Sequence, residues 1–573
     1  MQKLDDGRFK WFYFALGVTS IAFGYLRLWF GVDFLDEAWY VSLIQQFSLG
    51  ATPFVEEYSF QQMAYFFISP FYNIFYHDTD PPYTGAVLLV RHFYFIVVSI
   101  TAFTSFTLFK RFARNDISFV LSSLFFLDVF AIPSVSYNTI GRFAFFNGAA
   151  LLVIAYLDIR KNSAWISALS GIVLLISVLS YPTFVVPVFI LFSLAIAYEF
   201  YKTKQPKFSF IAASVFSAGL LCSLMFFYPL RSDIALSFQI MKTLSPYAQS
   251  FREKLAVIED ILPLIGVPCA LLFIYKRISR QSNLLFCSVV FLILLFAILG
   301  NDIPGFQYSR FLSCVTFFGL FLYIFFKNDF AENYFPLFVF VLLPVIAAGF
   351  TSALSSANGY SNICVGISPA AIISILFIHE KLKANFASEK YFLAIVFAAS
   401  TIFITISFRT IYNEKTVTQL TEQIKTGPYW GLFTTPEKAA FINLLSAELN
   451  RPEVRAKKTI LSYYNFPAGY LFTPLRSNGY STWVMSWFYS RPGFESLLNL
   501  VKIKQNKYFL DSENIADVIV RYRQNDPQFN GIQDGLEIYD PITVMIKESN
   551  FTALSSNPLF EIYVKNDAPL RDK

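Results

Sequence analysis

The sequence predicts a polytopic α-helical membrane protein that ends in a water-exposed α/β domain. Three observations lead to this fold class: long apolar runs recur along the first 409 residues, basic residues gather in alternate connections between these runs, and the composition changes after Arg409. Only 15% of the residues are charged, whereas soluble domains carry about 25%. We therefore expect a membrane module over residues 1–409 and a soluble domain over 410–573.

Each apolar run has close to the number of residues, about 20, that a helix needs to cross the hydrocarbon core of a bilayer. About thirteen runs are predicted as spans: 11–31, 87–109, 117–134, 142–158, 164–180, 183–200, 208–228, 258–275, 283–300, 310–326, 334–350, 363–379 and 390–408. The first run has no small-residue cleavage site and is longer than the apolar region of a signal peptide. We expect it to remain in the membrane.

The orientation follows from the excess of Lys and Arg that cytoplasmic loops carry. Alternate connections contain the basic residues Lys110, Arg111, Arg114, Arg160, Lys161, Lys202, Lys204, Lys207, Lys276, Arg277, Arg280, Lys327, Lys381 and Lys383. Placing them all in the cytosol with the N-terminus, and counting an odd number of spans, puts the residues after Arg409 outside. We expect a bacterial inner membrane protein with a periplasmic or extracellular C-terminal domain.

Two outer connections are long enough to contain structure of their own. The first loop (32–86) includes an aromatic, amphipathic stretch at 58–76 that predicts an interfacial helix, and a second loop covers 229–257. In the tail, the pattern of apolar residues predicts helices at 413–425 and 435–449, and strands at 458–464, 517–522 and 542–547.

Composition narrows the classes of function. A formal charge of +6 over 573 residues gives no reason to expect a nucleic-acid partner. All five Cys fall within apolar spans, and no Cys or His has zinc-binding spacing. The bilayer and its lipids are the expected surroundings of any site.

Three acids follow the first span directly: Asp33, Asp36 and Glu37, in GVDFLDEAWYVSL. A carboxylate in a partly desolvated cleft at the outer membrane face can accept a proton from a hydroxyl group, which is the work of a general base. The competing interpretation is that these acids flank a helix end because water is there. The adjacent Asp-Glu pair and the long loop behind it favour a functional role.

Several arginines stand where the charge rule would not place them. Arg91, Arg142 and Arg310 each lie near the outer end of a span, and Arg231, Lys242, Arg252 and Lys254 crowd the loop after the seventh span. Charges near the membrane interior often mark a substrate path, and Arg binds phosphate through paired hydrogen bonds. Snorkelling or structural pairing is the alternative for each one. Their common depth favours an anionic lipid ligand.

With these features the chain resembles the GT-C superfamily of glycosyltransferases. The resemblance rests on the Asp-Glu pair in the first outer loop, the interfacial segment behind it, Val90-Arg91 opening the second span, Arg310-Phe311 opening a later span, and the exported terminal domain. The architecture is similar to that of protein O-mannosyltransferases and lipid A aminoarabinose transferases. The resemblance implies an inverting enzyme that takes its sugar from a polyprenyl-phosphate donor and works outside the cytosol.

The resemblance also implies residue roles. Asp36 would be the general base, with Glu37 orienting the acceptor or supporting the loop. Arg91, Arg142 and Arg310, with Arg231 of the later loop, would bind the donor phosphate. The acceptor would be an envelope glycan, a lipid or a protein, and no cofactor is expected.

The chain departs from the family pattern in two places. The first-loop helix has Gln61 and Gln62 where relatives carry a Pro-Pro element, and the fourth span has Asn147, with Asn138 upstream, where relatives carry an acid. Because Asn binds a divalent cation weakly, the sequence disfavours a two-carboxylate metal site.

A further group of polar and aromatic residues could contact substrate, although turn, core or interface roles explain them as well. It comprises Asp33, Gln62, Asn138, Asn147, Asp302, Tyr308, Asn358, Trp430, Trp483 and Trp487.

Two other functions compete with sugar transfer: a polymerase or ligase of lipid-linked glycans, and a flippase or transporter of polyprenyl lipids. A transporter predicts mid-span ionisable residues and symmetric halves, and the sequence has no internal repeat. A sensor would need a cytosolic output module, and the predicted cytosolic loops are short.

Overall fold

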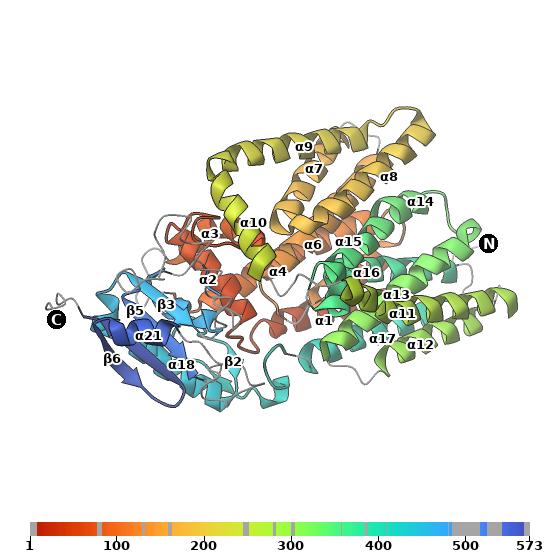
Figure 1. Cartoon of the computed structure of the whole chain (residues 1–573). Helices are drawn as coiled ribbons and strands as arrows, with labels where there is room; N and C mark the ends of the chain where they lie inside the picture. The colour runs from red at the N-terminus through yellow and green to blue at the C-terminus, as the bar shows by residue number, and fades with distance from the viewer. Residues whose placement is uncertain are drawn as a thin grey trace.

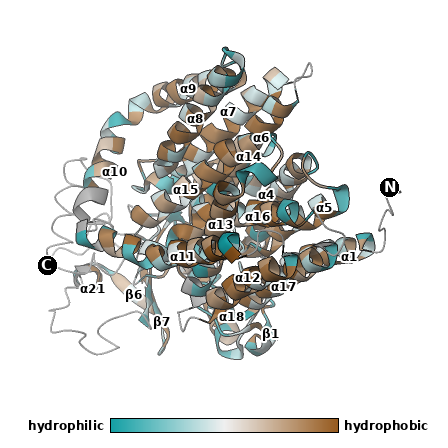
Figure 2. Cartoon of the chain, turned by 90° about the vertical axis from the view of Figure 1, so that its right-hand side faces the viewer, coloured by the Kyte–Doolittle hydropathy of each residue, from teal (hydrophilic) through white to brown (hydrophobic). Residues whose placement is uncertain are grey.

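The computed structural model describes residues 9–76, 83–128, 132–158, 163–244, 251–278, 282–299, 304–356, 358–383, 388–409, 411–463, 465–478, 481–483, 516–523 and 541–566. A large helical bundle occupies one side of the molecule, and a smaller domain with a β-sheet lies at one end of it (Figure 1). Hydrophobic residues dominate the bundle helices, and hydrophilic residues gather at helix ends and connections (Figure 2).

Helices follow one another through the first 409 residues. In chain order they are α1 (Lys10–Arg27), α2 (Asp36–Ser48), α3 (Met63–Tyr76), α4 (Ala86–Phe109), α5 (Asn115–Ser123), α6 (Tyr137–Leu157), α7 (Ser163–Ser180), α8 (Val185–Thr203), α9 (Phe208–Phe227), α10 (Arg231–Leu244), α11 (Phe251–Ile278), α12 (Asn283–Ile298), α13 (Pro304–Phe325), α14 (Tyr334–Leu337), α15 (Leu343–Leu354), α16 (Ile363–Leu382) and α17 (Ser388–Arg409). A π-helical turn, Phe338–Leu342, joins α14 to α15.

Within the described residues, ten helical stretches are long and apolar enough to cross a membrane, which confirms a multi-pass membrane protein. They are Ala86–Phe109, Tyr137–Leu157, Ser163–Ser180, Pro182–Thr203, Phe208–Ile240, Lys254–Ile278, Gln307–Phe325, Tyr334–Leu354, Gly359–Leu382 and Glu389–Arg409. Two shorter apolar helices, Asn115–Leu127 and Asn283–Ile298, and helix α1 match the three remaining predicted spans. The 117–134 run is shorter than expected, because its helix ends at Leu127 before a buried acid.

The two long outer connections contain helices. The predicted interfacial segment forms α3, which presents Phe71, Ile74 and Phe75 on its exposed face. The second connection contains α10, which directly continues α9 and packs over the first loop. The ring contact between Phe60 and Phe238, with centroids 6.4 Å apart, joins the two segments.

Bundle helices approach closely where small residues face each other. A Cβ atom on Gly366 of α16 would lie 2.2 Å from the backbone nitrogen of Gly349 on α15 and 2.3 Å from the carbonyl carbon of Ala348. No side chain fits there, so the glycine at position 366 allows α15 and α16 to pack this closely. Small residues at helix contacts are typical of membrane bundles.

The terminal domain is built on a mixed five-stranded sheet. Its strands are β3 (Thr459–Tyr463), β4 (Arg476–Ser477), β5 (Val518–Tyr522), β6 (Phe551–Ser556) and β7 (Phe560–Lys565), in the order β4-β3-β5-β7-β6. Strand β3 pairs in parallel with β4 and β5, and β7 pairs antiparallel with β5 and β6. Helices α18 (Pro436–Leu449), α19 (Pro452–Arg455) and α21 (Pro541–Glu548) accompany the sheet, which confirms an α/β domain.

Two of the predicted tail elements are wrong. The segment 413–425 is not a helix: it contains one 3-10 turn (Val417–Gln419) and strand β1 (Glu422–Gln423), which pairs with β2 (Phe433–Thr434). Its Thr and Val residues favour extended backbone. The expected strand at 542–547 lies in helix α21, which begins at a proline, and proline suits the first helical position.

The terminal domain lies directly against the end of the bundle at which α1 ends and α4 begins. A β-bridge pairs Phe30 with Phe433, and the backbone N–H groups of Gly85 and Val87 donate to carbonyls of the tail. Side chains of α2 also reach it: Gln45 donates to the Thr473 carbonyl at 2.8 Å. The tail is therefore part of the wall around the first outer segment.

Candidate functional site

The first acid of the cluster holds the start of α2. Asp33 is 3% exposed, and its two carboxylate oxygens accept hydrogen bonds from the backbone N–H groups of Leu35, at 3.2 Å, and Glu37, at 2.8 Å. The side chain of Asn413 donates to the same carboxylate at 2.9 Å. The bond from Glu37 satisfies one of the backbone N–H groups that the first turn of a helix leaves without a partner inside the helix. Asp33 is thus committed to structure, although we had predicted a substrate contact.

The third acid is held by an arginine. Arg91 donates from Nε to Glu37 Oε1 at 2.8 Å and from Nη2 to Glu37 Oε2 at 2.6 Å, and both side chains are almost fully buried. The same guanidinium donates to the carbonyls of Leu28, Phe30 and Gly31 at 2.7, 3.2 and 2.8 Å. These bonds fix the segment between α1 and α2 against α4. Arg91 was predicted to bind phosphate, but its N–H groups are occupied within the protein.

Asp36 differs from both neighbours because its side chain is partly exposed. The Tyr412 hydroxyl donates a hydrogen bond to it. Burial, and then the charge of nearby Asp33, raise the pKa of Asp36 to about 7. Burial and the Asp36 charge likewise raise the pKa of Tyr412. Of the three acids, Asp36 is the one whose carboxylate is placed to take up and release a proton near neutral pH.

Aromatic residues enclose Asp36, and sequence reasoning did not identify them as a group. Tyr40 of α2 stacks on Tyr65 of α3 with ring centroids 5.7 Å apart, and Tyr137 lies edge-on to Tyr40 at 6.2 Å. Burial first, and then the Asp36 charge, raise the pKa of Tyr40, which places the two groups within electrostatic reach. These rings form the low-dielectric walls that keep Asp36 from ionising at its ordinary pKa.

The tail closes over this aromatic group. Trp483 packs against Trp39 of α2 with ring centroids 5.0 Å apart, and Ser481 donates to the buried carboxyl of Glu57 at 3.0 Å. Trp39 Nε1 is buried and has no hydrogen-bond partner among the described residues. Trp430 lies beside Gly85 at the junction with α4 and is half exposed. Trp487 lies outside the described residues.

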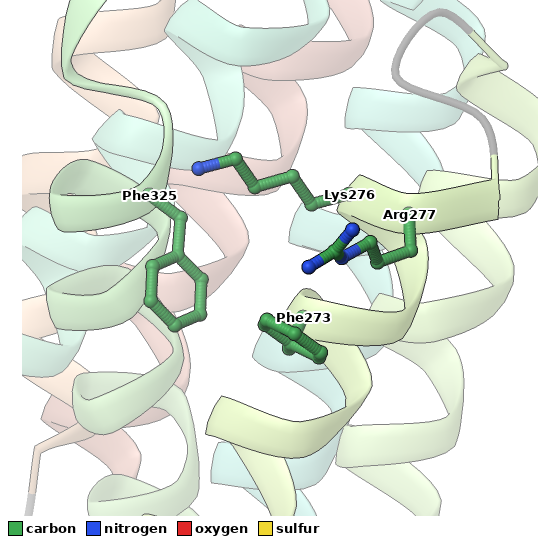
Figure 3. A pocket seen from close by; sticks show the side chains of 4 residues that line it. All are labelled: Phe273, Lys276, Arg277 and Phe325. Carbon is green, nitrogen blue, oxygen red and sulfur yellow. The ribbon is translucent and has the colours of Figure 1, made fainter.

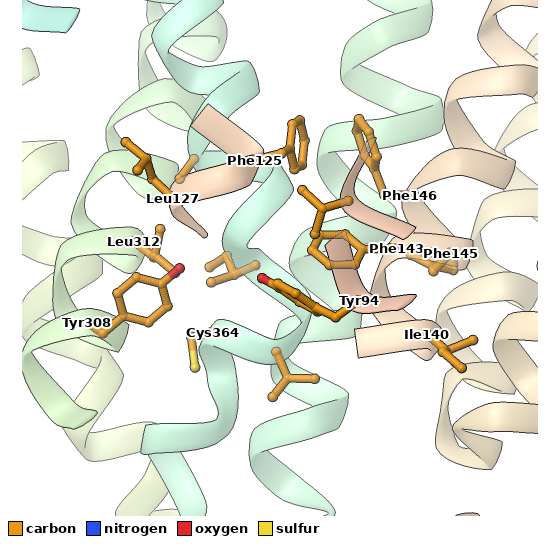
Figure 4. Packing of buried hydrophobic residues seen from close by; sticks show 14 of the residues in the cluster. Tyr94, Phe125, Leu127, Ile140, Phe143, Phe145, Phe146, Tyr308, Leu312 and Cys364 are labelled. Atoms are coloured by element: carbon orange, nitrogen blue, oxygen red, sulfur yellow. The ribbon is translucent and has the colours of Figure 1, made fainter. Parts of the chain in front are cut away.

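A second buried polar cluster, centred on Asp128, lies between the end of the Asn115–Leu127 helix and the early turns of α6 and α13. Arg142 Nη2 donates to the Asp128 carbonyl at 2.9 Å and its Nη1 lies 3.4 Å from the carboxylate. Tyr308 and Ser368 both donate hydroxyl hydrogen bonds to that carboxylate. In Figure 4 the hydroxyls of Tyr94 and Tyr308 point toward each other from opposite sides of this region.

The cluster gives two predicted residues a partner that we did not predict. Arg142 and Tyr308 were expected at substrate, whereas both bind Asp128 across three elements of the bundle. The sequence signal for this site is the single acid in the apolar stretch FFLDVF. Burying an ionisable residue in an apolar membrane segment costs free energy, so such a residue is expected to have a functional or structural role.

Three other predicted residues lie on separate elements. Arg310 packs its guanidinium over the Phe296 ring, 4.7 Å from the centroid, and is partly exposed. Arg231 is exposed on α10 and lies over the Tyr228 ring. Asn358 is exposed in the turn before α16.

Three predicted amides are buried. Gln62 forms hydrogen bonds within the first loop. Its amide nitrogen donates to the carbonyls of Glu57 and Ser59, and its amide oxygen accepts from the backbone N–H of Phe54. Asn147 donates to Thr101 and so joins α6 to α4. Asn138 sits one residue after Tyr137, and its buried side-chain oxygen has no hydrogen-bond partner in the described part of the chain.

Within the described ranges, no group of three or more His, Cys, Asp or Glu side chains is placed to hold a metal ion. The predicted contact Asp302 lies outside those ranges, as does the side chain of Lys242. Arg252 and Lys254 are exposed at the start of α11.

No protein-family profile matches this sequence, and no curated protein matches it. Solved structures of an oligosaccharyltransferase from Archaeoglobus fulgidus do match in fold. The structure tethered to an acceptor peptide is 12% identical, with a TM-score of 0.44 over 90% of this chain and 69% of that one. The structure of AglB with an inhibitory peptide and a dolichol-phosphate is 12% identical, with a TM-score of 0.47 over 98% and 75%.

A third match, the complex with Zn and sulfate, is 12% identical, with a TM-score of 0.46 over 89% of this chain and 68% of that one. Because the TM-scores are below 0.5, the case for a function rests on the residues of the site.

Proposed function

We propose that this protein is an inverting glycosyltransferase that moves a sugar from a polyprenyl-phosphate donor to an acceptor of the cell envelope. Asp36 is the general base. Its carboxylate takes the proton of the acceptor hydroxyl as that oxygen bonds to the anomeric carbon. The bond between the anomeric carbon and the phosphate oxygen breaks, and polyprenyl phosphate leaves with the electron pair.

The environment of Asp36 carries this proposal. Asp33 accepts a hydrogen bond from the backbone at the start of α2 and Glu37 binds Arg91, whereas Asp36 is partly exposed and has a pKa raised to about 7. A base with a pKa near the working pH is present as carboxylate and still holds a proton well enough to assist transfer. The aromatic walls of Tyr40, Tyr65 and Tyr137 would exclude water from the reacting atoms.

Arg310 and Arg231 are the cations that we assign to the donor phosphate. Both are at least partly exposed: Arg231 is the first residue of α10, and Arg310 lies in the early turns of α13. The donor headgroup would lie at these helix starts if the tail is periplasmic. Arg91 is left out because Glu37 and three carbonyls occupy it. Arg142 supports the site through Asp128, and its Nε remains without a partner.

In the proposed orientation, the N-terminus is cytosolic and the terminal domain is periplasmic, in a bacterial inner membrane. The terminal domain then lies over α2 and α3, where it would receive an envelope glycan, a lipid or a protein as acceptor. Polymerisation or ligation of lipid-linked glycans remains the alternative reaction at the same base. A flippase would not need Asp36 to exchange a proton with an acceptor.

The test is transfer from a synthetic polyprenyl-phosphate sugar to envelope extract by the purified full chain. The variant Asp36→Asn should lose transfer by about a hundredfold or more, the range attributed to general bases, while donor binding persists. The control is Glu56→Gln, which neutralises an acid of the same loop that pairs with Arg476. Unchanged transfer by Asp36→Asn would remove Asp36 as the base, and lost donor binding would give it a binding role instead.

A further inference from the structure

A groove of about 320 Å³ opens between α11 and α13, and it is lined by Phe273, Lys276, Arg277 and Phe325. It lies at the opposite end of the bundle from the candidate site. Phe325 is the last residue of α13, whose first turns hold Tyr308 against Asp128, and the helix is 22 residues long. At about 1.5 Å per residue, roughly 33 Å separates the two ends of the helix.

Two cations converge on this groove from the last turn of α11. In Figure 3 the side chain of Lys276 extends toward Phe325, and the guanidinium of Arg277 lies above the ring of Phe273. The Lys276 ammonium is 5.6 Å from the Phe325 ring centroid, and the Arg277 guanidinium is 5.3 Å from that of Phe273. Among the described residues, neither cation forms a hydrogen bond or an ion pair.

Other cations at this end have acidic partners in the structure. Lys381 pairs with Asp329 at 2.5 Å, and Lys202 pairs with Glu332. The groove therefore concentrates two positive charges that lack this compensation. The dipole of a helix also stabilises cations in its last turn, but that stabilisation requires neither a cavity nor aromatic walls.

The surroundings of the groove are apolar and face outward. Phe273, Ile274 and Ile278 are large hydrophobic residues exposed on α11. On a membrane-spanning helix such residues face acyl chains, so the groove joins an apolar surface to a basic rim. Basic pockets between transmembrane helices bind the headgroups of anionic lipids.

We propose that this groove binds an anionic phospholipid through its phosphodiester. Lys276 and Arg277 donate to the phosphate oxygens, and the acyl chains lie along Phe273, Ile274 and Phe325. The positive charge of the groove favours an anionic lipid over a zwitterionic one. The cationic group of a zwitterionic headgroup would be repelled by Lys276 and Arg277. This site is independent of the sugar-transfer proposal, because it lies at the other end of the bundle.

The experiment counts lipids on the purified full chain by native mass spectrometry, with phosphatidylglycerol or phosphatidylcholine as the added probe. We expect the wild type to retain one more phosphatidylglycerol than phosphatidylcholine. The double variant Lys276→Gln/Arg277→Gln should bind that lipid about tenfold more weakly or worse, because it loses two charge-assisted hydrogen bonds. The charge-conserving variant Lys276→Arg should retain it.

The matched control is Lys110→Gln/Lys207→Gln. It removes two exposed cations that lie over aromatic rings in the same manner, at 6.0 and 5.7 Å, outside the groove. This control should keep the lipid. The site would be overturned if the double groove variant retained as much phosphatidylglycerol as the wild type, or if the control lost as much of it as the groove variant. Displacement of the lipid by inorganic phosphate at matched concentration would overturn the lipid as occupant. Thermal unfolding in phosphatidylcholine verifies that each variant is folded.

Discussion

Arg91 and Glu37 form a two-point ion pair in which both side chains are almost fully buried, one at the first turn of α2 and the other in α4. The pair fixes the rotation of α2 about its axis. Because Asp36 directly precedes Glu37, this rotation also sets the direction of the Asp36 carboxylate. The ion pair is thus a positioning device for the proposed base.

The variant Arg91→Met should lower the free energy of unfolding by about 3–5 kcal/mol, because it leaves the Glu37 carboxylate buried without its partner. The measurement is thermal or denaturant unfolding in a fixed detergent. The control is Arg114→Met, whose side chain is 40% exposed and pairs with Asp116 and Glu389. That change should cost at most about 1 kcal/mol. Adding Glu37→Gln to Arg91→Met should recover part of the loss; equal losses in the Arg91 and Arg114 variants would contradict this account.

Sugar transfer should depend on pH through Asp36. Burial raises the pKa of Asp36 to about 7. The carboxylate form therefore increases as pH rises from 5 to 8, and kcat/KM should rise across that window and level off above it. The variant Tyr412→Phe removes the hydroxyl that donates to the carboxylate and should move the midpoint to higher pH. A midpoint near pH 4 in the wild type would contradict the proposed environment.

Glu57 should make folding stability depend on pH in the same window. Burial raises the pKa of Glu57 to about 7, despite hydrogen bonds from Ser59 and Ser481. The folded protein then holds the proton at pH values where the unfolded chain has released it. Stability is greatest below pH 4.5 for this group, falls as pH rises toward 7, and stays low above that value, by roughly 3 kcal/mol in all.

The variant Glu57→Gln removes this titration and keeps an oxygen for the same donors. Its melting temperature should equal that of the wild type near pH 4.5 and exceed it near pH 8. The neighbouring variant Glu56→Gln, at a partly exposed acid, should show no such pH-dependent gain. A Glu57→Gln protein that is less stable at pH 8 would show that the carboxyl is ionised and well bound in the folded state.

Two glycine variants should have opposite effects. Gly366→Ala places a methyl group within 2.3 Å of the backbone of α15, so it should separate the two helices and cost about 1–3 kcal/mol or more. Gly266→Ala in α11 meets no atom within 4 Å and should be neutral or stabilise by about 0.5–1 kcal/mol. Comparing the unfolding of both variants checks the α15 to α16 contact, and equal effects would refute it.

Much of the bundle could be predicted because a membrane-spanning helix can be recognised in a sequence by its length and its hydrophobic composition alone. The same rule missed the early end of the helix at Leu127, since there a buried acid stops the apolar run. In the tail, α18 and strands β3 and β5 match their predictions, whereas 542–547 is too short for its apolar pattern to separate helix from strand.

The site was only partly predictable. Asp36, Glu37 and Arg91 were all singled out, but residues 54 positions apart give no sign in one sequence that they bind each other. Asp128 was overlooked because its partners Arg142 and Tyr308 come from other helices. Pairing within the protein decides which charged residue stays available to a ligand, and that pairing is a property of the folded chain.

The bonds from Tyr412 and Asn413 to the acidic segment also bear on how the protein is made. Asn413 lies 380 positions after Asp33, so the start of α2 emerges from the ribosome long before the residues that hold it. A nascent chain can insert its first spans without acquiring the proposed active site. A chain that ends before Tyr412 would keep its membrane helices and lack the hydrogen bonds from Tyr412 and Asn413 to the acidic segment.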